Sequence, residues 1–172
     1  AFDRAPRVDL GRHLCPRQEP VDEQVIEDDR IEPSPLLTYT ACWLREYAPV
    51  CETPVLLHGD YRLGNFMFDE DTLEMTAVLD WELAHIGDFH EDVAYALEPL
   101  FCSRDAQGQL LVCSMMPVSA YLDGYAERSG RTIDPEVLLW YQVLTGFKLS
   151  LMNFASGVRA ARDGANHQSA LL

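Results

Sequence analysis

Basic residues are scarce in this sequence, and lysine is almost missing. Lys and Arg together number 13 against 28 Asp and Glu, so the formal net charge is −15 at pH 7. A field of that sign repels DNA, RNA and anionic membrane surfaces. The composition therefore argues against nucleic acid and membranes as partners. It suits a cationic substrate or bound metal ions, although an excess of acidic residues more often serves plain solubility.

Paired cysteines and long hydrophobic runs are also lacking. The five cysteines are odd in number and show no C-x-x-C spacing, which argues against a disulfide framework or a structural zinc site. The longest apolar stretch, residues 137–155, contains Gln142, Lys148 and Asn153 and is too polar to span a membrane. The first residues are charged and carry no apolar run typical of a signal peptide. We expect a soluble, cytoplasmic protein with reduced thiols.

The 172 residues, 48% of them hydrophobic, are enough for one folded domain. Residues 1–33 are predicted to be an acidic linker or surface segment, because seven acidic residues lie between Glu19 and Glu32 and the segment contains several prolines. Residues 34–172 are predicted to be the folded part.

The folded part is predicted to be α+β and mainly α. Ser34 and Pro35 have the pattern of a helix start, and Ser129-Gly130 that of a helix end. A last helix opens at Asp134-Pro135 and is apolar almost all round, so we expect it to be central. The remaining expected elements are short strands at 55–57, 66–68 and 76–79, a helix from 88 to about 98, and a loop through Asp105 and Gly108.

Two strings carry the chemistry: HGDYRLGN at residues 58–65 and LDWE at residues 79–82. Phosphoryl transfer to a hydroxyl needs a carboxylate that orients the hydroxyl and takes its proton. It also needs Asp and Asn oxygens that hold magnesium ions against the phosphates. Asp60 precedes Asn65 by five residues, the offset found in the protein-kinase catalytic loop, and Asp80 follows a predicted strand.

The string resembles the catalytic loop of the aminoglycoside phosphotransferases and their choline kinase relatives, in which His-Gly-Asp replaces His-Arg-Asp. The longer pattern HGDYRLGN, VLDWE, GD and D-x-A-Y is most similar to the branch that also occurs fused to acyl-CoA dehydrogenases. The resemblance is dense over residues 57–97 and looser to about residue 172. It implies a protein-kinase-like C-terminal lobe, in which helices surround a short β-hairpin catalytic region.

The resemblance also implies roles for individual residues. Asp60 would be the catalytic base, and Arg62 would face the transferred phosphate. Asn65 and Asp80 would bind Mg²⁺ and, through it, ATP as the co-substrate. Three further residues, His58, Glu82 and Asp92, would support the loop 58–65 and the metal-binding segment 79–82 structurally.

Two other functions fit the same residues. The chain could be a pseudokinase module that binds nucleotide or a partner without catalysis. A metal-dependent hydrolase could instead use His58, Asp60, Asp80 and His85, although their spacing matches no standard zinc motif.

A complete kinase also has a glycine-rich loop over the phosphates and a strand lysine that pairs with them. Here only Gly11 precedes His58, and the single lysine, Lys148, follows the catalytic loop. We therefore expect the chain to be a C-terminal lobe without its N-terminal lobe, inactive or nearly so by itself. The expected reaction of the parent enzyme is transfer of the γ-phosphoryl group of ATP to a hydroxyl of a small molecule. A cationic aminoglycoside and a hydroxylated acyl compound both fit as acceptors, and no pattern specifies an oligomeric state.

Overall fold

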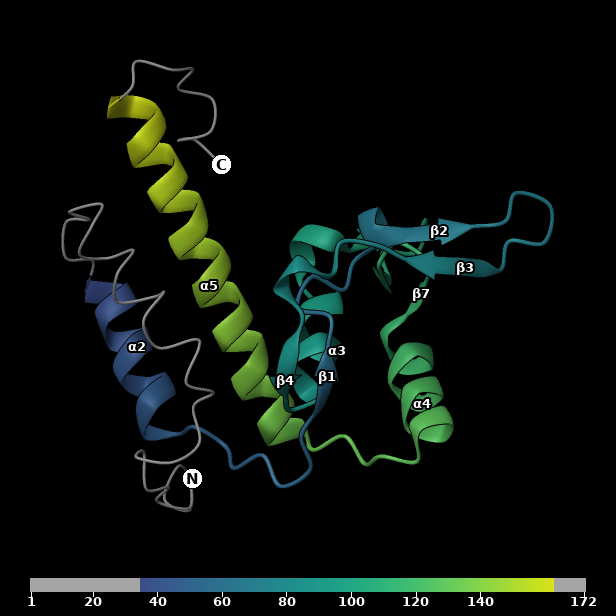
Figure 1. Ribbon diagram of the computed structural model, residues 1–172, viewed down its shortest axis with the longest axis horizontal. Helices are drawn as coiled ribbons and strands as arrows, with labels where there is room; N and C mark the ends of the chain where they lie inside the picture. Colours follow the sequence, from purple (N-terminus) through teal and green to yellow (C-terminus); the bar gives the residue numbers. More distant parts are fainter. Residues whose placement is uncertain (1–34, 163–172) are drawn as a thin grey trace. The chain divides into compact units, whose positions relative to one another are not determined.

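The computed structural model describes residues 35–162 (Figure 1). The predicted acidic segment 1–33 and the predicted cap Ser34 lie outside that range. Contacts divide the described residues into two compact units. One is Cys51–Gln142, and the other contains the first described helix and the part of the last helix that follows Gln142.

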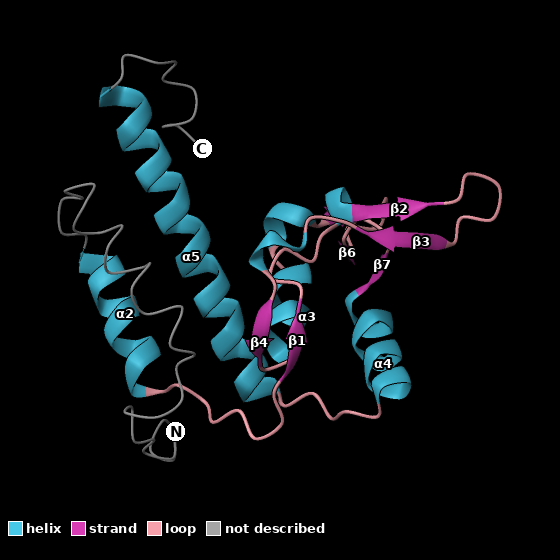
Figure 2. Cartoon of the chain, in the orientation of Figure 1, coloured by secondary structure: helices cyan, strands magenta, loops and turns pink. Residues whose placement is uncertain are grey.

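The described residues are mainly helical with short strands, as the sequence predicts (Figure 2). The helices are α2 (Pro35–Glu46), α3 (His90–Ala96), α4 (Val118–Ser129) and α5 (Pro135–Arg162). Single 3₁₀ turns η1, η2 and η3 cover Leu63–Asn65, Trp81–Leu83 and Pro99–Phe101. None of these described helices combines the length and apolar character that crossing a bilayer needs.

Local residues fix the ends of the last two helices. At the start of α5, Asp134 Oδ1 accepts hydrogen bonds from the backbone N–H groups of Glu136 and Val137 at 2.8 and 3.3 Å. At the end of α4, Gly130 takes the left-handed conformation with φ 66°, and its N–H donates to Ala126 O at 3.0 Å. Both helix ends lie where the sequence predicts them, because capping depends on residues next to one another in the chain.

Two pairs of antiparallel strands flank the loop 58–65. Strand β1 (Val55–Leu57) pairs with β4 (His85–Gly87), and Leu56 lies opposite Ile86. Strand β2 (Phe66–Phe68) pairs with β3 (Met75–Val78) as a hairpin, which Figure 1 shows side by side. β1 and β2 have the predicted bounds, whereas β4 is not predicted from the sequence. The loop thus leaves one strand pair and enters the other.

The predicted loop through Asp105 and Gly108 is wrong in part. A three-stranded sheet stands there, formed by β5 (Ser103–Arg104), β6 (Leu110–Val112) and β7 (Met116–Pro117). Asp105 and Gly108 form the turn between β5 and β6, where Gly108 has φ 83°. β5 and β7 have two residues each and contain neither the alternation nor the apolar run by which a strand is recognised in sequence.

The core of the Cys51–Gln142 unit is made of side chains from several elements. Leu57, Val93 and Val112 come from β1, α3 and β6, and each is exposed by 2% or less. Each such side chain stabilises the fold by about 1.5–3 kcal/mol relative to full exposure. Leu57 immediately precedes the loop 58–65, so the buried core fixes one end of that loop.

Helix α5 is not buried on all sides, contrary to the prediction. Leu138 and Trp140 are 8% and 5% exposed, but Leu139 between them is 56% exposed. Met152 and Phe154 are also exposed, by 61% and 44%.

Two glycine substitutions should have opposite effects on stability. Gly130→Ala places a side chain at a left-handed φ of 66°, and we expect it to lower the free energy of unfolding by about 1–2 kcal/mol. Gly146 lies inside α5, and we expect Gly146→Ala to raise the free energy of unfolding by about 0.5–1 kcal/mol. At neither position would the new Cβ meet an atom within 4 Å, so only the backbone conformation differs. Urea denaturation measures the free energy of unfolding of both variants. Changes of the same sign would contradict the claim that backbone conformation decides the effect.

Candidate active site

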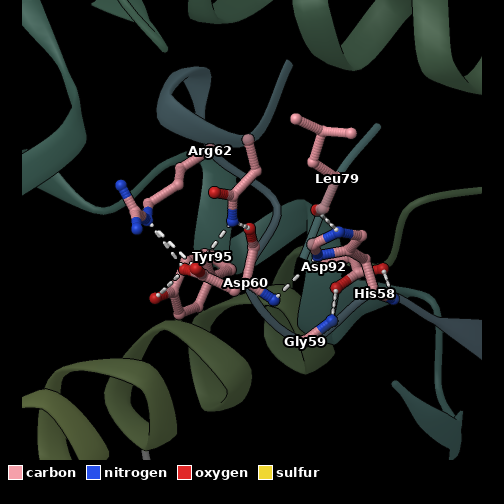
Figure 3. Close-up of polar contacts among 8 residues, drawn as sticks. His58, Gly59, Asp60, Arg62, Leu79, Asp92 and Tyr95 are labelled. Carbon is pink, nitrogen blue, oxygen red and sulfur yellow. Dashed lines mark hydrogen bonds and ion pairs between the residues drawn. The ribbon is translucent and has the colours of Figure 1, made fainter. Parts of the chain in front are cut away.

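The loop 58–65 is held to α3 by one carboxylate. Asp92 Oδ2 accepts a hydrogen bond from the backbone N–H of His58 at 2.7 Å, and Asp92 Oδ1 accepts one from that of Gly59 at 2.9 Å (Figure 3). Hydrogen bonds to an ionised acceptor are stronger than those between neutral groups. Asp92 therefore fixes the backbone one and two residues before Asp60.

Gly59 occupies a position that other residues fit poorly. Its φ is 82°, and a Cβ there would lie 2.6 Å from Leu83 O. Backbone conformation and the close approach of the 3₁₀ turn η2 both require glycine. This contact brings the segment 79–82 against the loop 58–65.

His58 is buried, at 3% exposure, and both of its ring nitrogens are bonded. Its Nδ1 accepts the backbone N–H of Asp60 at 3.1 Å, so Nδ1 carries no proton and Nε2–H donates to Leu79 O at 2.7 Å. The Trp81 ring lies 4.7 Å from the imidazole, measured between centroids. His58 thus connects the Asp60 backbone to the chain that follows β3.

Asp80 follows β3 after one intervening residue, Leu79. Leu79 is hydrogen-bonded through both its N–H group and its carbonyl oxygen. Leu79 N–H donates to Asn65 O at 2.8 Å, and Leu79 O accepts from His58. Asp80 follows with φ 66°, a left-handed conformation that non-glycine residues seldom adopt. Its side chain is exposed, while Asn65 is buried at 5% exposure. The chain thereby brings Asp80 next to the segment that carries Asn65.

The Asp60 carboxylate receives four hydrogen bonds from three side chains. Tyr95 Oη donates to Oδ1 at 2.7 Å, and Asn65 Nδ2 donates to Oδ2 at 2.7 Å. Arg62 Nε lies 2.9 Å from Oδ1 and 3.1 Å from Oδ2. Asn65 Nδ2 also donates to the backbone oxygen of Asp60 at 2.9 Å. Figure 3 shows Arg62 and Tyr95 converging on Asp60.

These donors determine the charge state of Asp60. Burial by itself raises the pKa of the carboxyl group, but hydrogen bonds from Tyr95, Arg62 and Asn65 outweigh it, so the pKa lies below its usual value. In turn, the hydrogen bond to Asp60 raises the pKa of Arg62. Asp60 and Arg62 therefore form an ion pair at neutral pH.

Tyr95 is the residue of this cluster to which the sequence gives no role. It lies on α3, and its ring stacks on Phe101 with centroids 5.2 Å apart. The Arg62 guanidinium carbon lies 5.7 Å from the centre of the same Phe101 ring. The signal for Tyr95 is its place in the string D-x-A-Y, which the sequence resemblance includes without a function.

The oxygens of Asn65 and Asp80 suit a magnesium ion. Asn65 donates hydrogen bonds to Asp60 through Nδ2. Its Oδ1 accepts no hydrogen bond from a residue in the described part of the chain. The Asp80 carboxylate is exposed and likewise makes no hydrogen bond to a described residue. Mg²⁺ takes one or two protein oxygens together with water and substrate phosphates. Glu82, in η2, is also exposed.

The contacts of the histidines do not favour a zinc site. His58 has no ring lone pair left for a metal, because Nδ1 accepts a hydrogen bond and Nε2 carries the proton. His85 Nε2 lies 3.3 Å from Glu91 Oε2, and its Nδ1 lies 2.9 Å from Leu83 O. Within residues 35–162, no three His, Cys, Asp or Glu side chains are grouped so that they could hold a metal ion.

Comparison with known proteins places the chain in a family. The model of the phosphotransferase enzyme family matches residues 2–141. The chain belongs to this family. Its membership agrees with the resemblance seen in the sequence and supports a kinase-like phosphotransferase.

Curated relatives of this chain include acyl-CoA dehydrogenase family proteins. Family member 10 of Mus musculus is 46% identical over 54 residues, which are 31% of this chain and 5% of the relative. Family member 11 of Rattus norvegicus is 27% identical over 95% of this chain and 22% of the relative. The chain therefore spans less than a quarter of either relative.

Two solved structures share the fold of this chain. A Ralstonia eutropha protein provisionally described as an aminoglycoside phosphotransferase aligns with a TM-score of 0.72 and 24% identity, over 95% of this chain and 53% of that one. A type VIII aminoglycoside 3'-phosphotransferase aligns with a TM-score of 0.56 and 20% identity, over 74% of this chain and 48% of that one. These alignments establish the fold and span about half of each neighbour.

Gly59→Ala should be markedly more harmful than Gly108→Ala. Both glycines have φ near 82°, but only at Gly59 would a Cβ meet Leu83 O, whereas nothing lies within 4 Å at Gly108. We expect Gly108→Ala to lower the free energy of unfolding by about 1–2 kcal/mol through backbone strain. Gly59→Ala should lower it by about 1–3 kcal/mol more through overpacking. Equal values from urea denaturation would show that the contact with Leu83 is unimportant.

The stabilisation from Asp60 should disappear in acid. Because folding lowers the pKa of Asp60, its contribution to stability is complete above the unfolded-state pKa of about 3.9 and is lost as pH falls through the lower folded-state pKa. Wild type should therefore be more stable than Asp60→Asn at neutral pH, with the difference narrowing below about pH 4. Urea denaturation of both proteins at a series of pH values measures this difference in stability. A difference independent of pH would contradict a lowered Asp60 pKa.

Proposed function

We propose that the protein transfers the γ-phosphoryl group of ATP to a hydroxyl group of a small molecule. The observation that carries this proposal is the pairing of Asp60 with Asn65. Asn65 Nδ2 donates to Asp60 Oδ2 at 2.7 Å, which leaves Asn65 Oδ1 for a cation beside an ionised carboxylate. Membership of the phosphotransferase family supports the same reaction class.

In this mechanism Asp60 acts on the acceptor. Its carboxylate accepts a hydrogen bond from the acceptor hydroxyl and orients the hydroxyl oxygen toward the γ-phosphorus. It takes the proton as the new O–P bond forms, while the bond from the γ-phosphorus to the bridging oxygen breaks and ADP leaves. A carboxylate of lowered pKa is a weak base. The transition state of phosphoryl transfer is mostly dissociative, so alignment of the hydroxyl contributes more than strong basicity does. The four hydrogen bonds on Asp60 fit a group whose main task is orientation.

Asn65 and Asp80 would hold Mg²⁺. When bound, the ion neutralises the phosphate oxygens and fixes their orientation. Arg62 supplies positive charge beside Asp60, toward the transferred phosphoryl group. His58 and Asp92 keep the loop backbone in place through the hydrogen bonds described above. Glu82 belongs to the same segment as Asp80 and would support it.

Two classes of small molecule are supported as the acceptor that carries the hydroxyl group. The solved neighbours are described as aminoglycoside phosphotransferases, and the net charge of −15 favours a cationic acceptor. The curated relatives are named as acyl-CoA dehydrogenase family members, which favours a hydroxylated acyl compound.

The test uses the full-length protein with MgATP labelled in its γ-phosphate and, separately, an aminoglycoside and a hydroxylated acyl-CoA. We expect labelled phosphate on one acceptor, and Asp60→Asn should lower kcat by about 100-fold or more. Asp80→Ala should abolish magnesium-dependent binding of ATP in calorimetry, whereas Asp60→Asn should retain it.

Asp123→Asn is the matched control, because Asp123 is an exposed carboxylate on α4 that makes no hydrogen bond to a residue of the loop. It should leave both activity and binding unchanged. Full activity of Asp60→Asn would overturn the proposal. Tight MgATP binding without transfer to any hydroxyl would instead indicate a non-catalytic nucleotide-binding module.

A further inference from the structure

The hydroxyl of Tyr95 is given no separate role in the mechanism above, although it makes one of the two shortest contacts to Asp60. Tyr95 Oη donates to Asp60 Oδ1 at 2.7 Å across 35 residues of sequence. The ring is placed by α3 and by stacking on Phe101 at 5.2 Å and 27°. The donor is therefore held by two elements other than the loop that carries Asp60.

The Asp60 carboxylate has no room for a further donor in this arrangement. Two carboxylate oxygens offer about four lone-pair positions. Arg62, Asn65 and Tyr95 together make four contacts with them. An acceptor hydroxyl can bond to Asp60 only after one of these donors has left.

Arg62 is the donor best placed to leave. Its side chain is 37% exposed, against 13% for Asp60, and its Nε is shared between both oxygens at 2.9 and 3.1 Å. A guanidinium also binds phosphate oxygens well, so an incoming phosphoryl group competes for it. Asn65, by contrast, is 5% exposed and bonds to the Asp60 backbone oxygen as well.

We propose that Tyr95 is a positioning residue, which holds the Asp60 carboxylate in place while Arg62 turns from Asp60 to the phosphoryl group. Tyr95 then retains Oδ1 and Asn65 retains Oδ2, so the plane of the carboxylate is fixed at both oxygens. The position vacated by Arg62 receives the acceptor hydroxyl. This inference rests on the proposed phosphotransferase function.

The kinetic test compares two tyrosine substitutions in the full-length protein. Tyr95→Phe keeps the ring on Phe101 and removes only the hydroxyl. Because misplacing a reacting group by about 1 Å costs about 100-fold in rate, we expect kcat to fall by about 10- to 100-fold. The KM for MgATP should stay within about twofold, since Tyr95 makes no hydrogen bond to Asn65 or Asp80, which are proposed to bind Mg²⁺ and the nucleotide.

Tyr125→Phe is the matched control. Tyr125 is also partly buried and stacks on a phenylalanine, Phe89, with centroids 5.6 Å apart, but it lies on α4 and makes no hydrogen bond to Asp60. It should leave kcat and KM unchanged. An unchanged kcat for Tyr95→Phe, or a fall matched by Tyr125→Phe, would overturn the inference.

A second measurement separates this inference from the proposed function. Urea denaturation of the full-length protein gives the effect of Tyr95→Phe on the unfolding midpoint, in wild type and in the Asp60→Ala background. We expect a lower midpoint in wild type and little change in the Asp60→Ala background. If wild type transfers no phosphate, the proposed function fails, yet this cycle still decides whether Tyr95 holds Asp60. Equal shifts in both backgrounds would show that it does not.

Discussion

The Asp92 carboxylate is the interaction on which the candidate site depends. It accepts the backbone N–H groups of His58 and Gly59 and thereby joins the loop to the first turn of α3. Two neighbouring N–H groups can share one carboxylate only if the loop turns sharply, and Gly59 at φ 82° makes that turn. The other contacts of the site depend on this turn. With the loop in this conformation, His58 bonds to Leu79, and the Asp60 carboxylate bonds to Asn65 and Tyr95.

A chain of backbone contacts converts a short sequence motif into a three-dimensional site. Four of the bonds that position Asp60 and Asp80 involve main-chain atoms of Asp60, Asn65 and Leu79. Main-chain bonds are insensitive to side-chain chemistry at the positions between the motif residues. The loop 58–65 and the segment after β3 can therefore hold their relative positions although few of their residues are chemically special.

The sequence predicts the parts of the fold that depend on neighbouring residues. The ends of α4 and α5 follow from Gly130 and Asp134, and the bounds of β1 and β2 follow from short apolar runs. β4, β5 and β7 are not predictable, because their two or three residues form no apolar run, and β4 pairs with β1, which is distant in the chain. Likewise, the spacing of Asp60 and Asn65 is visible in the sequence, whereas Tyr95 reaches Asp60 through the packing of α3, which no local pattern encodes.

The backbone contacts of Leu79 determine which residues members of the family can carry at this position. Both of its contacts to the loop use backbone atoms, and its side chain is 47% exposed. Most side chains at this position would leave the link between β3 and the loop intact. Proline is the exception, because it has no N–H to donate to Asn65. A search pattern that demands leucine before Asp80 would thus reject relatives that keep the same site.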